Sequence, residues 1–287
     1  MARAVAGENL FVTGGAGTGK TETLRRIYRE LRSAHGEDAV ALTATTGMAA
    51  KRLGGRTLAN FAGWGAVDPL SITATEVLRR VQANAKAVAR WRQTKTLIID
   101  EISVMHGRMV DIMNCLAKYL RGNRSTSFGG LQVISGGDFF QLPPVVEDDE
   151  EGKAMPPSLV EWAFESGTWA KEKAVSAALL TRVFRQSDEE FVGILNKLRV
   201  GAAGAAEWKR LEVLAAKQQL SKKAVYLRPL RESVDEKNVS EFARLGSPVR
   251  RCVKCNTNSR LSKCLRSCAS AGDVMVGLDG AGIPKPS

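Results

Sequence analysis

Short apolar runs alternate with amphipathic stretches through the first half of the chain. Four runs, at 9–13, 40–43, 96–99 and 131–135, predict β-strands. The run at 96–99 has no polar alternation, which is typical of a strand that is buried on both faces. Strands that alternate with helices in this way predict an α/β protein with a parallel sheet and helices on both faces.

The stretches between these strands carry helical signals. Residues 20–32 and 109–120 repeat their apolar positions at the spacing of one helix face, and a short helix is predicted at 46–52. The apolar positions are Leu24, Ile27, Tyr28 and Leu31 in the first helix and Met109, Ile112, Met113, Leu116 and Leu120 in the second. These helices supply the layers that cover the sheet.

Two further segments have patterns of their own. Residues 63–94 are broken by Pro69 and continue as a polar, alanine-rich helical stretch, which predicts a small helical insertion. A helix is predicted to begin after Ser187, which forms a capping box with Glu190, and to end near Gly201.

The chain divides into three parts on this evidence. We expect a complete first domain at 1–175 with the insertion at about 63–95, a partial second domain at 176–247, and a basic tail at 248–287. The tail lacks a periodic apolar stripe. It contains four cysteines whose spacing leaves two interpretations open, a zinc site or unstructured thiols. They are Cys252, Cys255, Cys264 and Cys268.

Composition and charge narrow the class of protein. Hydrophobic residues make up 44% of the chain and charged residues 25%, which are values of a globular protein. The net charge of +12 favours a polyanionic partner such as nucleic acid, although a basic but inert surface has the same composition. The uncharged run at 39–50 is too short to span a bilayer, so no membrane association is expected.

The segment "GGAGTGKT" matches the full phosphate-loop pattern between a predicted strand and a predicted helix. Glycines let backbone N–H groups wrap phosphates, and the helix N-terminus adds partial positive charge. Lys20 is expected to reach the β- and γ-phosphates of ATP, and the Thr21 hydroxyl to bind Mg²⁺. The predicted nucleotide-binding residues are Gly14, Gly15, Ala16, Gly17, Thr18, Gly19, Lys20 and Thr21.

An acidic pair ends the strand in "TLIIDE". Asp100 is expected to hold Mg²⁺, and Glu101 to orient and deprotonate the attacking water. The alternative for Glu101 is a surface carboxylate.

Gln141 follows a buried strand in "GGDFFQLPPV". Residues just past the carboxyl ends of parallel strands line the ligand crevice, so its amide is expected to donate to the γ-phosphate or to the attacking water. The alternative is an amide that closes a turn.

Five segments in this order resemble the Pif-family DNA helicases of superfamily 1B. They are "GGAGTGKT", "TATTGMAAKRLGGRTLANFAGWG", "IIDEISVMHGRMVDIM", "GGDFFQLPPV" and "TRVFRQSDEEF". The resemblance covers roughly residues 8–245 and implies RecA-like topology with an incomplete second RecA-like domain. A different phosphate-loop ATPase, such as a kinase, is the rival interpretation, and "FAGWG" and "GDFFQLPPV" argue against it.

The resemblance implies ATP-driven 5′→3′ movement on single-stranded DNA. It implies Mg²⁺ as a cofactor, a 5′-tailed duplex as a substrate, and a role in DNA repair, recombination or telomere maintenance. Lys20, Asp100, Glu101 and Gln141 match the family's catalytic positions, and Arg185 matches its arginine finger. We expect a monomer, and leave nucleus and mitochondrion open as its compartment.

The same resemblance implies a DNA-contacting segment. Its expected phosphate ligands are Thr43, Thr45 and Thr46, with Lys51 and Arg52 as electrostatic contacts. Phe61 and Trp64 are either stacking platforms for bases or core residues.

Two features of the family pattern are missing. No glutamine precedes the first strand, and the later motifs of the second motor domain are absent. We therefore expect a truncated helicase with weak unwinding, or alternatively a nucleotide- and DNA-binding fragment without turnover.

Overall fold

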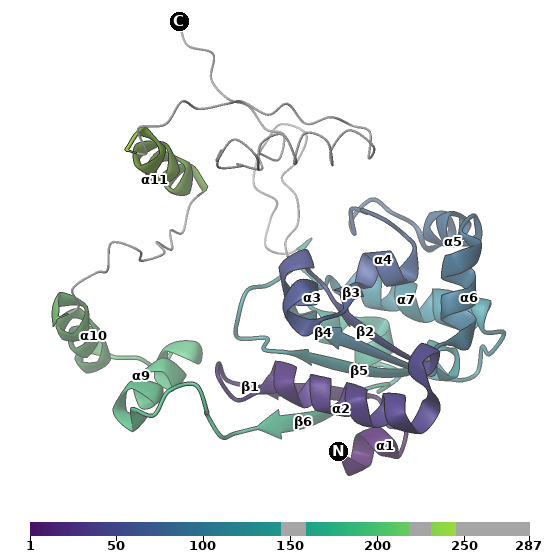
Figure 1. Ribbon diagram of the computed structural model, residues 1–287, viewed down its shortest axis with the longest axis horizontal. Helices are drawn as coiled ribbons and strands as arrows, with labels where there is room; N and C mark the ends of the chain where they lie inside the picture. The colour runs from purple at the N-terminus through teal and green to yellow at the C-terminus, as the bar shows by residue number, and fades with distance from the viewer. Residues whose placement is uncertain (145–158, 218–230, 245–287) are drawn as a thin grey trace, which may run out of the picture. The chain divides into compact units, whose positions relative to one another are not determined.

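The computed structural model describes residues 1–144, 159–217 and 231–244. The chain forms two compact units, 1–217 and 218–287. The first is an α/β unit with a six-stranded parallel sheet in the order β3-β2-β4-β5-β1-β6 (Figure 1). The strands are β1 (Leu10–Gly14), β2 (Val40–Ala44), β3 (Arg56–Thr57), β4 (Thr96–Asp100), β5 (Gln132–Gly137) and β6 (Ser176–Leu180). The predicted α/β class and parallel sheet are confirmed.

Helices cover both faces of this sheet. In Figure 1, α2 lies on one face and α4 to α7 lie on the other. The α-helices of the unit are α1 (Ala2–Val5), α2 (Lys20–His35), α3 (Gly47–Leu53), α4 (Leu58–Ala62), α5 (Ala74–Gln82), α6 (Ala85–Gln93), α7 (Gly107–Leu120), α8 (Gly167–Ala170), α9 (Glu189–Arg199) and α10 (Ala205–Lys217). Short 3-10 helices lie at η1 (Glu37–Ala39), η2 (Ile102–Val104), η3 (Ser127–Gly130) and η5 (Ala163–Glu165).

The core consists of two apolar clusters, one on each face of the sheet. Alternate residues of a strand point to opposite faces. Leu97 and Ile99 of β4 therefore join the cluster under α4 to α7, while Ile98 joins the cluster under α2 and α3. All three side chains are fully buried. The sheet is thus fixed from both sides, and its carboxyl ends are held in register.

The predicted helical insertion is confirmed, and it adds to the core. Trp91 of α6 is fully buried, its indole N–H donates to the Ala62 carbonyl at 3.0 Å, and its ring lies 5.4 Å from that of Phe61. Phe61 and Trp64 are also buried. The interpretation of these two residues as stacking platforms is therefore wrong, because neither ring is accessible to a base.

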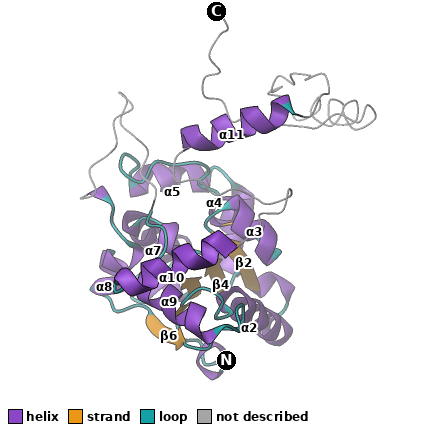
Figure 2. Cartoon of the chain, turned by 90° about the vertical axis from the view of Figure 1, so that its left-hand side faces the viewer, coloured by secondary structure: helices purple, strands orange, loops and turns teal. Residues whose placement is uncertain are grey.

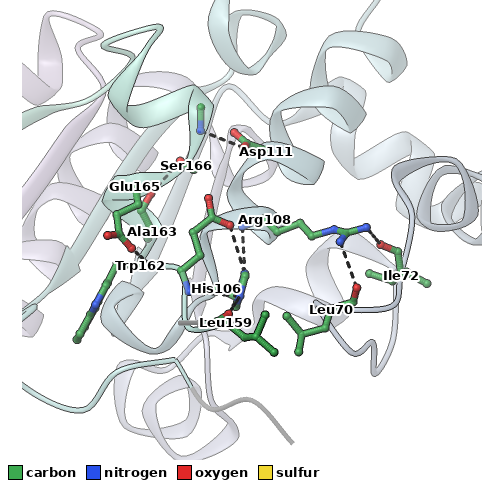
Figure 3. A network of polar contacts seen from close by, with 12 residues as sticks. Leu70, Ile72, His106, Arg108, Asp111, Leu159, Trp162, Ala163, Glu165 and Ser166 are labelled. Carbon is green, nitrogen blue, oxygen red and sulfur yellow. Dashed lines mark hydrogen bonds and ion pairs between the residues drawn. The ribbon is translucent and has the colours of Figure 1, made fainter. Parts of the chain in front are cut away.

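A polar network attaches the chain to α7 where the described residues resume at 159 (Figure 3). His106 is buried; its Nε2 lies 3.0 Å from the Leu159 carbonyl, and its Nδ1 accepts from the Arg108 amide at 3.2 Å. Asp111 accepts from the Gly167 and Thr168 amides at 3.0 and 2.7 Å. These bonds hold the segment that leads into β6.

Two details differ from the sequence analysis. The sheet continues past residue 175, because β6 pairs in parallel with β1. Asp188, not Ser187, caps α9: its side chain accepts from the Phe191 amide at 3.0 Å. Two neighbouring residues can both cap a helix, and the boundary moved by one position. Gly201 ends the helix in a left-handed conformation, as predicted.

The second unit is described only for α11 (Arg231–Ala243) and Arg244. The four tail cysteines lie outside the described residues. Among the described helices, none has the length and apolar character needed to cross a membrane. The division into a first and a partial second domain stays a prediction.

Candidate functional site

The loop between β1 and α2 has a backbone that only glycine adopts easily. Gly17 and Gly19 have φ values of 79° and 86°, in the left-handed region. A Cβ atom at Gly14 would lie 2.3 Å from the Leu180 carbonyl oxygen, and one at Gly17 would lie 2.6 Å from the Arg185 Cβ. The glycines are therefore required by close packing as well as by conformation.

Lys20 points back into this loop. Its Nζ donates to the carbonyls of Gly14 at 2.8 Å and Gly15 at 3.1 Å. Burial lowers the pKa of Lys20, and the nearby carboxylates, Asp138 foremost, oppose that shift. No side chain caps α2 at Gly19, so the amides of its first turn have no side-chain partner there. An ammonium group and unpaired amides thus converge on one small volume, as an anion-binding loop requires.

The predicted acidic pair lies directly beside the loop. The Thr21 hydroxyl donates to Asp100 Oδ2 at 2.9 Å, and Asp100 is buried. Burial and the Asp100 charge both raise the pKa of Glu101, which is half-buried. The interpretation of Glu101 as an ordinary surface carboxylate is not favoured by this environment.

Glu101 also has an unusual backbone. Its φ is 58°, a left-handed value that is uncommon outside glycine and concentrates at functional sites. Its carbonyl accepts from the Thr45 hydroxyl at 2.8 Å, and its amide donates to Asp100 Oδ1 at 3.0 Å. Thr45, directly after β2, and the preceding aspartate therefore hold the strained residue in place.

Gln141 lies at the carboxyl end of β5 and is exposed. Its amide Nε2 donates to Asp138 Oδ2 at 3.2 Å, and its backbone N–H donates to the Asp138 carbonyl at 2.9 Å. Asp138 is buried and forms a bidentate ion pair with Arg199. Asp138 and Arg199 were not among the predicted site residues.

Arg185 lies against Gly17 of the phosphate loop. The Phe184 amide donates to the Gly17 carbonyl at 2.8 Å, which brings the 181–188 segment against the phosphate loop. The Arg185 side chain is exposed, and its guanidinium forms no hydrogen bond to any described residue. Four separate chain segments, at 14–21, 100–101, 138–141 and 184–185, therefore meet at one edge of the sheet.

The three threonines predicted to contact DNA differ in their surroundings, and the half-buried Thr45 donates its hydroxyl to the Glu101 carbonyl. Thr43 is fully buried and its hydroxyl donates to the Ile98 carbonyl at 2.7 Å, so the prediction that it binds a DNA phosphate is wrong. Thr46 caps α3 through the Ala49 amide and is exposed. Lys51 and Arg52 are exposed on the same helix.

This sheet, with a phosphate loop after its first strand, defines a phosphate-loop protein of the RecA-like class. Residues 2–245 match the family described as PIF1-like helicase. The chain is 42% identical over 193 residues to the ATP-dependent DNA helicase RRM3 of Saccharomyces cerevisiae, and covers 25% of that protein. It is 37% identical over 245 residues to the ATP-dependent DNA helicase PIF1 of Emericella nidulans, and covers 31% of it. These alignments cover 67% and 83% of this chain.

Solved structures agree with these matches. A Pif1 helicase from Candida albicans is 36% identical with a TM-score of 0.74, over 86% of this chain and 53% of that one. A Bacteroides Pif1 helicase in complex with ADP-AlF3 and single-stranded DNA is 26% identical with a TM-score of 0.64, over 85% and 54%. The chain belongs to the PIF1-like helicase family. It spans roughly a quarter to a third of the length of the curated relatives quoted above.

Proposed function

We propose that this chain carries the ATP-hydrolysing core of a 5′→3′ DNA helicase that acts in DNA repair, recombination or telomere maintenance. The observation that supports this most is the convergence of the phosphate loop, the acidic pair, Gln141 and the Arg185 segment at one sheet edge. Each of these segments was expected there from the family resemblance.

The residues of the loop fit a nucleoside triphosphate with Mg²⁺. The glycine cradle leaves no room for a Cβ at Gly14 or Gly17, and Lys20 supplies a cation inside it. Thr21 and Asp100, already joined by a hydrogen bond, are the oxygen ligands that would hold Mg²⁺. When bound, the metal neutralises charge that develops on the transferring phosphate.

The chain's own residues then divide the chemical work. The carboxylate of Glu101 takes the proton from the attacking water, and its raised pKa makes it a stronger base than an ordinary glutamate. Gln141 donates its amide toward the γ-phosphate or that water. Arg185, whose Cβ lies against Gly17, supplies an exposed guanidinium that stabilises negative charge on the transferring phosphate.

Single-stranded DNA and 5′-tailed duplex DNA are the proposed partners, bound by a monomer. A related Bacteroides Pif1 structure is described as bound to single-stranded DNA. Here the net charge of +12 and the exposed Thr46, Lys51 and Arg52 support a phosphate-contacting face near the end of β2.

The decisive experiment measures ATP hydrolysis by the 287-residue chain with and without a single-stranded oligonucleotide. We expect DNA to stimulate hydrolysis, and the Glu101→Gln variant to lose about 10²- to 10⁴-fold in kcat while it keeps its affinity for ATP. Lys20→Ala should lose that affinity. A wild type that binds both ligands but hydrolyses ATP no faster than Glu101→Gln would instead support a binding fragment without turnover.

A further inference from the structure

Arg199, the last residue of α9, forms an ion pair with Asp138, which directly follows β5. Its Nε donates to Asp138 Oδ2 at 2.9 Å and its Nη2 donates to Oδ1 at 2.7 Å. The Asp138 side chain is 1% exposed and that of Arg199 is 24% exposed. A bidentate pair fixes the orientation of both groups more strictly than a single contact does.

The same aspartate organises the turn that carries Gln141. Asp138 Oδ1 accepts from the Phe140 amide at 3.2 Å, while Oδ2 accepts from the Gln141 side chain at 3.2 Å. Gln141 is exposed, so packing does not hold its side chain. Among the described residues, Asp138 is the hydrogen-bond partner of its amide nitrogen. The position of that amide therefore depends on Asp138.

Arg199 secures this arrangement in two further ways. Its guanidinium lies over the Phe140 ring, 4.4 Å from the centroid, which is a cation–π contact. Burial would raise the pKa of Asp138, but the hydrogen bonds from Arg199 and the Phe140 amide outweigh burial, and the pKa is lowered. Asp138 thus stays charged, with Arg199 on one side and Lys20 on the other.

Helix α9 and the segment before it both lie against the phosphate loop. Phe184, just before it, bonds to Gly17, and a Cβ at Gly15 would lie 3.5 Å from the Asn196 side-chain oxygen. Residues 184–199 therefore connect the predicted arginine finger to the turn that carries Gln141.

We propose that Arg199 is a positioning residue that acts through Asp138: it fixes the Gln141 amide toward the γ-phosphate and joins that amide to α9. This inference rests on the proposed function, in which Gln141 reads the γ-phosphate. When a nucleoside triphosphate binds, the Gln141 amide changes its contact with Asp138. The same Asp138 carboxylate holds the end of α9 through Arg199.

The test compares the affinity of the 287-residue chain for ADP and for a non-hydrolysable ATP analogue, both with Mg²⁺. Arg199→Ala should reduce the preference for the triphosphate by about tenfold and leave ADP affinity nearly unchanged. The matched control is Arg210→Ala, because Arg210 makes an equally bidentate pair with Glu190, but on the exposed surface between α9 and α10. That control should bind both nucleotides as the wild type does.

Two further variants keep the result interpretable. Arg199→Lys keeps the charge but loses the two-pronged geometry, so a partial loss of preference is expected even if the alanine variant folds poorly. The proposal would be overturned if both Arg199 variants kept the wild-type preference for the triphosphate over ADP. It would also be overturned if they lost affinity for ADP and for the ATP analogue by the same factor.

Gln141→Ala separates this inference from the proposed function. If that variant loses the triphosphate preference while Arg199→Ala keeps it, only the role of Arg199 fails. If Gln141→Ala keeps the wild-type preference, Gln141 does not read the γ-phosphate and this inference fails, whereas the proposed ATP hydrolysis is still decided by the Glu101→Gln and Lys20→Ala variants.

Discussion

The two sides of the phosphate loop are built in different ways. On the sheet side, Asp100 and Glu101 follow a buried strand, and hydrogen bonds from Thr21 and Thr45 hold them. On the α9 side, Arg185 is exposed and is placed by the Phe184–Gly17 bond, and the Arg199–Asp138 pair holds the end of α9. The first side is fixed by the core, whereas the second depends on a few polar contacts that a ligand can rearrange.

The largest expected effect is on the α9 side. Arg185→Ala should lower kcat for ATP hydrolysis by about 10³- to 10⁵-fold, because the guanidinium stabilises charge only in the transition state. Its exposure means that the melting temperature should not change. Arg182→Ala is the matched control: Arg182 is also exposed, but it lies over the Phe184 ring at 5.0 Å. Equal rates in both variants would remove Arg185 from the proposed site.

The second largest effect is expected at the contact between Gly17 of the phosphate loop and Arg185. In Gly17→Ala, the added methyl would lie 2.6 Å from the Arg185 Cβ, so the loop or the 184–185 segment must move. We expect a loss of nucleotide affinity of about tenfold or more, measured by titration with a fluorescent ATP analogue.

The control for this variant is Gly54→Ala. Gly54 has a similar φ of 81°, against 79° at Gly17, but a Cβ there meets no atom within 4 Å. Both variants carry the left-handed strain of about 1–2 kcal/mol, and only Gly17→Ala should bind nucleotide more weakly. Equal affinities would show that crowding at this contact has no functional consequence.

The smallest expected effect is a gain in stability on the sheet side. The pKa of Glu101 is raised by burial, so the folded protein favours its protonated form, and that stability is lost as pH rises through the raised pKa. Glu101→Gln resembles the protonated form. Without nucleotide, it should match the wild type below the ordinary carboxyl pKa of 4.5 and be more stable at neutral pH.

Urea unfolding at the two pH values measures this difference. Glu22→Gln is a control of opposite sign, because hydrogen bonds from Arg25 and Arg29 lower the pKa of Glu22. It should lose a little stability at neutral pH and none in acid. A Glu101→Gln variant that is less stable than the wild type at neutral pH would contradict the strained, desolvated environment of Glu101.

Residues whose neighbours are close in sequence were the most predictable. The phosphate loop, α2 and the acidic pair follow from local patterns, since strand, glycine turn and helix are consecutive. Strand β6 was not predicted, because its sequence, SAALL, has neither the β-branched residues nor the alternation that is typical of a strand. Thr43 was misassigned because a threonine-rich strand end does not reveal which hydroxyls face the interior.

The Asp138–Arg199 pair shows the limit of such patterns. The two residues are 61 positions apart, one directly after β5 and the other at the end of α9, and neither belongs to a motif that specifies a partner. The signal that was available is the acid in "GGDFF": an aspartate at the end of a buried strand requires a cation when it is itself buried. Tertiary packing determines which of the 42 lysines and arginines supplies that cation.

The pairing of β6 with β1 has a kinetic consequence. Leu180 ends β6 beside Gly14, and Arg185 follows only five positions later (185 − 180 = 5). Five residues span at most about 18 Å. The guanidinium is therefore covalently tethered close to the phosphate loop, and its effective concentration there is in the millimolar range or above. The rate of ATP hydrolysis per molecule should therefore not depend on protein concentration. It would fall on dilution in an enzyme whose arginine finger comes from a second protein molecule.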